Sequence, residues 1–154
     1  MTKSILIAAL AALLLPAGLA SAGSDPGSEP DVRIVDGSAQ RELDAARAAW
    51  HAFGPRHYRL RIATDCFCAE EVRRPRRIEV LGGRPVERPP AHLRRYATVR
   101  RLFARVQEAI DAEVAGLTAE YDRHGLPRTI FVDVSHNIAD EEHGVRIVAF
   151  RVLD

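Results

Sequence analysis

The sequence predicts an α+β fold in which a single antiparallel sheet of about five strands has two helices packed on one face. Two stretches, residues 39–53 and 99–115, repeat apolar residues at the three- and four-residue spacing of a buried helix face. Shorter segments alternate apolar and polar residues, which is typical of strands with one buried side. One domain over residues 38–154 is therefore expected.

The first helix and the first strand open this domain. Ser38 is expected to cap the helix and Gly54-Pro55 to end it. The apolar stripe of the helix consists of Leu43, Ala46, Trp50 and Phe53. Residues 57–63 then alternate, with Tyr58, Leu60 and Ile62 on one side and Arg59 and Arg61 on the other. The second set is expected to face solvent.

A hairpin and a second helix follow. Ile78 and Val80 lie in a strand that ends at Gly82-Gly83, a dipeptide suited to a tight turn. Pro85 cannot donate a ladder hydrogen bond, so the returning strand is predicted to be an edge strand or to end early. Pro89-Pro90 indicates a crossing loop toward a second helix, which is expected to begin after a Thr98 cap and to stop at Gly116.

The last third of the chain predicts three strands, near residues 117–121, 129–134 and 145–153. Between the first two, Asp122 to Pro127 reads as a turn, because Asp bonds its own following backbone and Gly125 tolerates positive φ.

Residues 1–22 read as a secretory signal peptide. Lys3 precedes an uncharged apolar run, and Ala20-Ser21-Ala22 is a small-x-small cleavage site. Cleavage near Ala22 would yield an exported protein, periplasmic or secreted, and the apolar run is too short for a transmembrane segment. Residues 23–37 contain mainly Gly, Ser, Pro and Asp, so they are expected to be a disordered spacer.

Charge is unevenly distributed along the chain. Eleven Arg and only two acids lie between Arg73 and Arg105, whereas residues 106–154 hold four Arg and ten acids. Either the two segments pair with each other, or the basic segment meets an anionic partner such as lipid head groups, a wall polymer or an acidic protein. Export disfavours nucleic acid as that partner.

Cys66 and Cys68 are the only cysteines. In an oxidising compartment they predict a disulfide, although a bend is needed because residues two apart in a strand are separated by roughly 6.6 Å. We expect a bulge near Thr64-Asp65 that buries Phe67 and exposes the sulfurs; an unbroken strand would do the reverse. Packed thiols, redox exchange and a metal site remain alternatives. Further ligands for a metal would come from His57, His124, His136 or His143.

The acidic segment 133–142 offers oxygen ligands to a hard cation such as calcium. The weak candidate ligands are Asp133, Asp140, Glu141 and Glu142. Because the segment lacks the spacing of the helix-loop-helix calcium motif, a solvated hairpin loop is the favoured interpretation.

An ordered set of motifs resembles a known family. The set comprises Cys66-Phe67-Cys68, then Tyr121-Asp122 to Gly125-x-Pro127, Ile130, Asp133 and Ala139-Asp140-Glu141-Glu142. It is similar to a bacterial family of exported or lipid-anchored proteins classified only as a domain of unknown function, over roughly Leu43 to the C-terminus. Similar members often carry a lipid-accepting Cys, which this chain lacks. The resemblance implies domain limits and no activity.

These observations favour a noncatalytic exported module that binds a partner or has a structural role. No spacing selects a catalytic group, and no cofactor is indicated. The alternatives are an accessory protein that uses Cys66 and Cys68 in thiol chemistry, and a cation-binding domain that uses the acidic segment.

Overall fold

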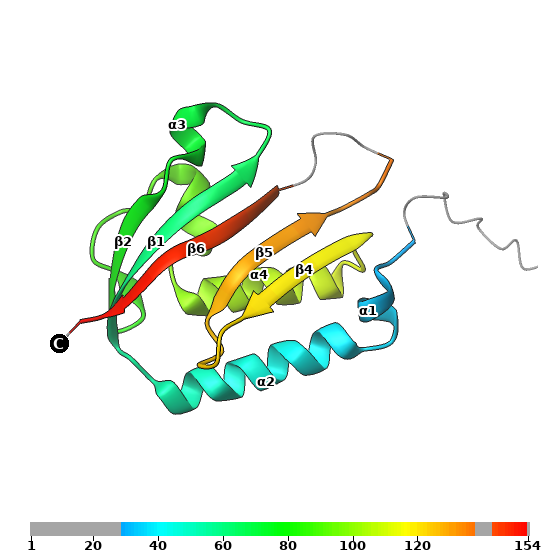
Figure 1. The fold of residues 1–154 in the computed structure, drawn as a ribbon, viewed down its shortest axis with the longest axis horizontal. Helices are drawn as coiled ribbons and strands as arrows, with labels where there is room; N and C mark the ends of the chain where they lie inside the picture. Colours follow the sequence, from blue (N-terminus) through cyan, green and yellow to red (C-terminus); the bar gives the residue numbers. More distant parts are fainter. Residues whose placement is uncertain (1–28, 138–142, 154) are drawn as a thin grey trace, which may run out of the picture.

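The computed structural model describes residues 29–137 and 143–153. Over these residues, six strands form one antiparallel sheet in the order β3-β2-β1-β6-β5-β4 (Figure 1). The strands are β1 (His57–Cys66), β2 (Arg76–Leu81), β3 (Arg84–Pro85), β4 (Gly116–Tyr121), β5 (Pro127–Asp133) and β6 (His143–Val152). The helices are α1 (Val32–Val35), α2 (Ser38–Phe53), α3 (Glu70–Arg73), the 3-10 helix η1 (Ala91–Tyr96) and α4 (Val99–Asp111). The predicted fold class is confirmed, with the short β3 as a sixth strand.

Both long helices pack on the same face of the sheet. In Figure 1, α4 runs behind β4 and β5, and α2 lies beside it. One core cluster joins apolar side chains of both helices to the inward side of the strands. Its fully buried members include Leu43, Leu60, Ile62, Leu102, Val106, Ile130 and Val145. We call the opposite side of the sheet the outer face.

The hairpin between β2 and β3 follows the prediction. Gly82 and Gly83 adopt φ values of 58° and 78°, the left-handed conformation that such a turn requires. Pro85 lies opposite Val80 in β3, which is an edge strand of the sheet. A two-residue edge strand that contains proline offers little backbone for pairing with another chain.

Two helix ends differ from the prediction. The N-cap of α2 is Gly37, with φ 74°, and Ser38 is already helical. For α4 the Thr98 cap is confirmed, since its side chain accepts from the Arg101 amide at 3.2 Å. However, α4 ends at Asp111, because the chain must reverse before Gly116, and Glu113 makes this reversal at φ 49°. Apolar periodicity alone does not reveal the reversal.

The segment before α2 is folded from Asp31 onward, so the expectation of a disordered spacer is wrong there. The Asp31 carboxylate caps α1 and also accepts from the Leu117 amide at 2.9 Å, while its own amide donates to the Val114 carbonyl. The Arg33 guanidinium donates to the Leu117 carbonyl at 3.5 Å. The segment thus satisfies backbone groups of the edge strand β4. The predicted signal peptide lies outside the described residues.

The turn from Asp122 to Pro127 is a rigid attachment to α2. The Asp122 carboxylate accepts from the amides of His124 and Leu126, at 2.9 and 3.1 Å. Gly125 has φ 78°, and a Cβ atom there would lie 2.0 Å from the Ala46 carbonyl oxygen. Only glycine fits at this contact. The predicted turn is confirmed, and the structure gives it a packing role.

Candidate anion-binding surface

A groove between the loop after β3, η1 and α4 forms a cavity of about 550 Å³. We call it the α4 groove. Its charged lining consists of Arg88, Arg94, Arg95, Arg101 and Arg105 together with Glu87 and Glu108. All five arginines come from the basic segment found in the sequence. With five cations against two anions, the α4 groove carries an excess of three positive side chains.

One carboxylate serves two arginines of the α4 groove. Glu108 accepts from Arg95 at 2.8 Å and from Arg105 at 3.4 Å. Arg101 donates to the backbone carbonyl of Arg94 at 2.6 Å rather than to an acid. The Arg95–Glu108 pair is exposed on both sides and contributes about 0–1 kcal/mol, so an incoming anion can replace it at little cost.

Arg105 is the anchored guanidinium of the groove. Its side chain is only 12% exposed, and its Nε is buried without a hydrogen-bond partner. Its Nη2 lies 2.8 Å from Nε2 of His143, and since Arg can only donate, this imidazole nitrogen accepts. The contact ties α4 to the first residue of β6 and fixes the guanidinium in place.

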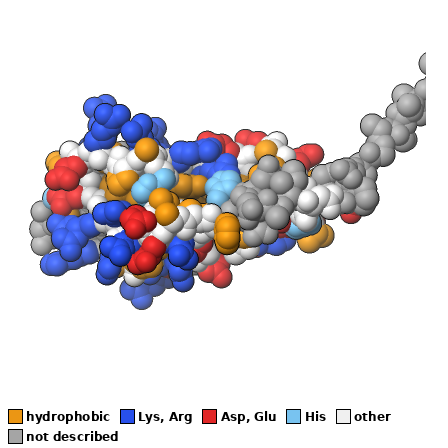
Figure 2. All heavy atoms as spheres, turned by 90° about the horizontal axis from the view of Figure 1, so that it is seen from above, with side chains coloured by type: hydrophobic (Ala, Val, Ile, Leu, Met, Phe, Trp, Pro, Cys, Tyr) orange, Lys and Arg blue, Asp and Glu red, His pale blue; other side chains and the backbone are white. Residues whose placement is uncertain are grey.

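Positive charge continues around the β3 edge. A second cavity, of about 430 Å³, shares the loop residues 86–89 with the α4 groove and adds Arg59, Arg77 and Glu79. Figure 2 shows arginine side chains, in blue, gathered mainly over the half of the molecule that carries α3 and β2. Glu79 and Glu87 are the acids that line this second cavity, and Glu79 is the one with ion-pair partners on the sheet. It accepts from Arg59 at 2.7 Å and contacts His57 Nε2 at 2.9 Å, and these hydrogen bonds lower its pKa.

Ion pairs between described residues involve only three arginines of the basic segment. Of its eleven arginines, Arg95 and Arg105 pair with Glu108, and Arg74 pairs locally with Glu70. The other eight make no ion pair with a described residue: Arg73, Arg76, Arg77, Arg84, Arg88, Arg94, Arg100 and Arg101. Among the described acids of residues 106–154, Glu108 is the one that pairs with this segment, whereas Asp122 and Asp133 accept hydrogen bonds from nearby backbone amides.

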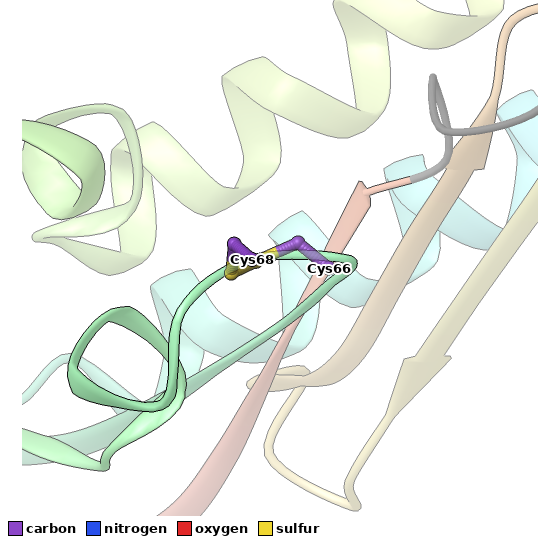
Figure 3. The surroundings of a disulfide bond; sticks show 2 residues. All are labelled: Cys66 and Cys68. Carbon is purple, nitrogen blue, oxygen red and sulfur yellow. A yellow bond between two sulfur atoms is a disulfide. The ribbon is translucent and has the colours of Figure 1, made fainter.

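The cysteine pair lies at the end of β1, where the chain turns toward α3 (Figure 3). The two Cα atoms are 5.3 Å apart and the sulfurs are joined as a disulfide. Oxidation of the pair in the native protein stays a prediction. The small cavity beside it is lined by Cys66, Phe67, Cys68, Ala69 and Arg73, with no acid or base besides this arginine.

The predicted burial of Phe67 is wrong, since this side chain is 91% exposed. The expected bulge near Thr64-Asp65 is also absent: the register between β1 and β6 shifts between Arg61 and Ile62 instead. The reason is that β1 ends at Cys66, so Phe67 lies in the turn that follows and not on the inward side of a strand. An apolar side chain such as Phe67 is buried only where another part of the fold packs against it, and its own apolar character does not provide that partner.

The histidines considered as further metal ligands are dispersed. His57 contacts Glu79, His124 stacks on Phe53 at 4.1 Å, and His136 Nδ1 contacts Asp133 at 2.6 Å. Of the four, only His143 lies opposite a cysteine, in register with Cys66. Among residues 29–137 and 143–153, no three His, Cys, Asp or Glu side chains are grouped so that they could hold a metal ion.

The acidic segment is described only in part. Asp133 is buried at 7% exposure, and its carboxylate accepts from the Ser135 amide and contacts His136. The other candidate cation ligands, Asp140, Glu141 and Glu142, lie outside the described residues. Cation binding by this segment stays a prediction.

Sequence reasoning placed Arg59 and Arg61 on the solvent side of β1 without assigning them to a site. Their neighbours Ala149 and Arg151 come from β6, about ninety residues later. The alternating pattern gave the direction of the β1 side chains. It does not identify the partner strand, so the pairing of Arg59 with Arg151 of β6 is not predictable from it.

Comparison with protein families finds a match over residues 42–152 to a family model described as a family of unknown function (DUF6174). Comparisons with curated proteins and with solved structures find no match. In the part of the chain that the structure describes, no helix has the length and apolar character needed to cross a membrane.

Proposed function

This chain belongs to the family of unknown function DUF6174, and we propose that it is a noncatalytic exported domain that binds phosphate-bearing anionic partners through the α4 groove. The resemblance found in the sequence is thereby supported as far as a family of unknown function. Export and the binding role are proposals.

The observation that carries the proposal is the set of eight arginines without an acidic partner among the described residues, three of which line a concave surface. Guanidinium groups present planar forks of donors that match phosphate oxygens two at a time. Arg88 and Arg94 supply exposed forks, while the buried stem of Arg105 supplies a fixed one. A phosphate-bearing ligand complements this arrangement in both charge and geometry.

Binding is favoured over catalysis by the composition of the groove. Its described lining contains arginines, two glutamates, prolines, valine and alanine, with no Ser, Cys or His beside a base. Acyl or phosphoryl transfer ordinarily needs a positioned nucleophile or a general base. The two glutamates are the groove's candidate general bases, but Glu108 is already paired with Arg95 and Arg105, and no Ser or Cys nucleophile lines the groove. Holding an anion is therefore the role that we propose for it.

The test is a titration of the mature protein with linear polyphosphate, in which binding is measured by calorimetry at several salt concentrations. We expect binding whose log affinity falls linearly with log salt, as for other polyanions. The Arg88→Ala/Arg94→Ala double variant should bind at least about tenfold more weakly, because two charge-assisted contacts are lost.

A matched control double variant is Arg100→Ala/Arg123→Ala, which removes two exposed arginines outside the α4 groove. It should retain most of the affinity at fixed salt. Equal losses in both double variants would show nonspecific attraction and overturn the proposal, as would absence of binding at low salt. Vesicles of phosphatidylcholine with and without phosphatidylglycerol then distinguish a lipid source of the phosphate from a polymer.

Export is tested on protein from the native host. N-terminal sequencing of material from the extracytoplasmic fraction should begin near Gly23, following cleavage after Ala22. Intact mass under alkylation, with and without reductant, reports in the same sample whether Cys66 and Cys68 are bonded. A protein that begins at Met1 and remains in the cytoplasm would contradict the export proposal.

A further inference from the structure

We infer that the outer face of the sheet carries a second anion site, for a phosphate-type dianion, formed by Arg61, Arg77 and Arg151. This outer-face site is separate from the α4 groove and does not depend on the function proposed for it. Its cavity of about 260 Å³ is lined by Arg59, Leu60, Arg61, Arg77, Ala149, Phe150 and Arg151.

Strand register brings these arginines together. Arg61 of β1 lies directly opposite Arg77 of β2 and, on its other side, opposite Ala149 of β6. In the neighbouring row, Arg59 lies between Glu79 and Arg151. Side chains directly opposite each other on a sheet have Cβ atoms about 5 Å apart, and diagonal neighbours are within reach of long side chains. The short Ala149 side chain leaves an open floor among the guanidinium groups.

The site has unbalanced charge. Glu79 is the acid in these two rows, and it is already engaged by Arg59 and His57. Arg61, Arg77 and Arg151 make no ion pair with a described residue. Like charges directly opposite each other destabilise a sheet, so the Arg61–Arg77 pair is unfavourable in the free protein. A bound dianion would remove this repulsion.

A β-bulge creates the arrangement. Arg61 pairs with Ala149 and the next residue, Ile62, pairs with Ile147, so Val148 is an extra residue in β6. Because side chains alternate along a strand, the extra residue exchanges the two faces beyond it. It directs Phe150 to the core, where this ring lies 5.8 Å from both Trp50 and Tyr58, and it directs Arg151 to the outer face. Without the bulge, Arg151 would point toward the core side.

The chemistry selects the ligand class. Three guanidinium groups on one shallow surface match the two charges and several oxygens of a phosphate better than a single carboxylate. The surface is open, so a phosphate monoester on a larger molecule can reach it as well as a free ion. Inorganic phosphate is therefore a suitable probe.

The test is an NMR titration of the amide signals of the whole mature protein with phosphate, against chloride at equal ionic strength. We expect saturable shifts at residues of β1, β2 and β6 around Arg61, Arg77 and Ala149. In Arg77→Ala these shifts should require at least about tenfold more phosphate. Without phosphate, the variant should have an unchanged or higher unfolding temperature, because it lacks the opposed pair.

The matched control is Arg76→Ala, which removes the neighbouring exposed arginine of β2 that does not line the cavity. It should keep the wild-type response. Shifts confined to α4 and η1, or equal shifts with chloride, would overturn this inference while leaving the α4 groove supported. Conversely, Arg88→Ala/Arg94→Ala should leave the outer-face shifts in place, so the two proposals can fail separately.

Discussion

The two edges of the sheet use polar side chains in opposite ways. At the β4 edge they complete the fold: Asp31 and Arg33 bond the backbone of Leu117, and Asp122 closes the turn that docks on α2. Around the β3 edge, by contrast, arginines surround cavities and mostly lack acidic partners among the described residues. Polar groups whose hydrogen-bond or ion-pair partners lie within the protein stabilise the fold, whereas polar groups without such partners remain available to a ligand.

If the polar groups at the β4 edge stabilise the fold, Gly125→Ala should cause the largest loss of stability. The new Cβ would meet the Ala46 carbonyl, and the residue would also keep φ 78°. We expect a loss of about 3 kcal/mol or more in the free energy of unfolding, measured by urea denaturation. Gly83→Ala, at φ 78° with no atom within 4 Å, should cost only about 1 kcal/mol. Equal effects would show that the contact with α2 is unimportant.

The second effect concerns the β4 edge itself. Asp31→Ala removes the α1 cap and the acceptor for the Leu117 amide, so a loss of about 2 kcal/mol is expected. Hydrogen exchange at the Leu117 amide should accelerate together with this loss. Asp31→Asn keeps one acceptor oxygen and should lose less. Unchanged exchange in the alanine variant would contradict the role of this segment as an edge cover.

Tyr121, at the end of β4, gives a pH-dependent effect. Burial, followed by the nearby Glu42 carboxylate, raises its pKa to about 12, and its hydroxyl is buried without a partner. Because the pKa of Tyr121 is higher in the folded protein than its unfolded value near 10, the protonated phenol stabilises the folded state relative to the phenolate. This contribution of Tyr121 to the free energy of unfolding is complete below pH 10 and is lost as the pH rises from 10 to 12.

Tyr121→Phe should therefore leave stability at pH 7 nearly unchanged and flatten the decline in unfolding temperature between pH 10 and 12. Tyr58→Phe is the contrasting variant. The Tyr58 hydroxyl accepts from the Val99 amide at 3.2 Å, so its removal should cost about 1 kcal/mol already at pH 7. A substantial loss of unfolding free energy at pH 7 in Tyr121→Phe would indicate that the Tyr121 hydroxyl makes a hydrogen bond in the folded protein, contrary to this interpretation.

The smallest effects on stability are expected on the β3 side. Arg88→Ala and Arg94→Ala remove exposed side chains without ion pairs, so each should change the free energy of unfolding by less than about 0.5 kcal/mol. The same variants are those expected to weaken polyphosphate binding. Thermal denaturation beside calorimetry tests both statements, and a large destabilisation would place these arginines in the fold rather than in a site.

Much of the fold was predictable because its signals are local. The alternation of Tyr58, Leu60 and Ile62 and the helical stripe of Leu43 and Ala46 each arise from the geometry of a single element. Predictions failed where another element decides. The residues after Asp111 keep helical periodicity although the chain reverses there, and Phe67 is exposed because it lies in the turn after β1.

The candidate site was predictable to a similar extent. The excess of arginine between Arg73 and Arg105 is visible in composition, and so is the possibility of an anionic partner. Composition could not say which of these arginines pair internally. Ion pairs depend on distances between side chains that are remote in sequence, as for Arg95 with Glu108.

By itself, the amino-acid sequence determined the class of fold, the order of its main elements and the basic character of one segment, because periodicity and charge are properties of neighbouring residues. The tertiary structure alone decided that Asp31 covers the β4 edge and that Arg151 joins Arg61 on the outer face. Both depend on the register between distant segments, and one extra residue at Val148 is enough to exchange the faces of a strand.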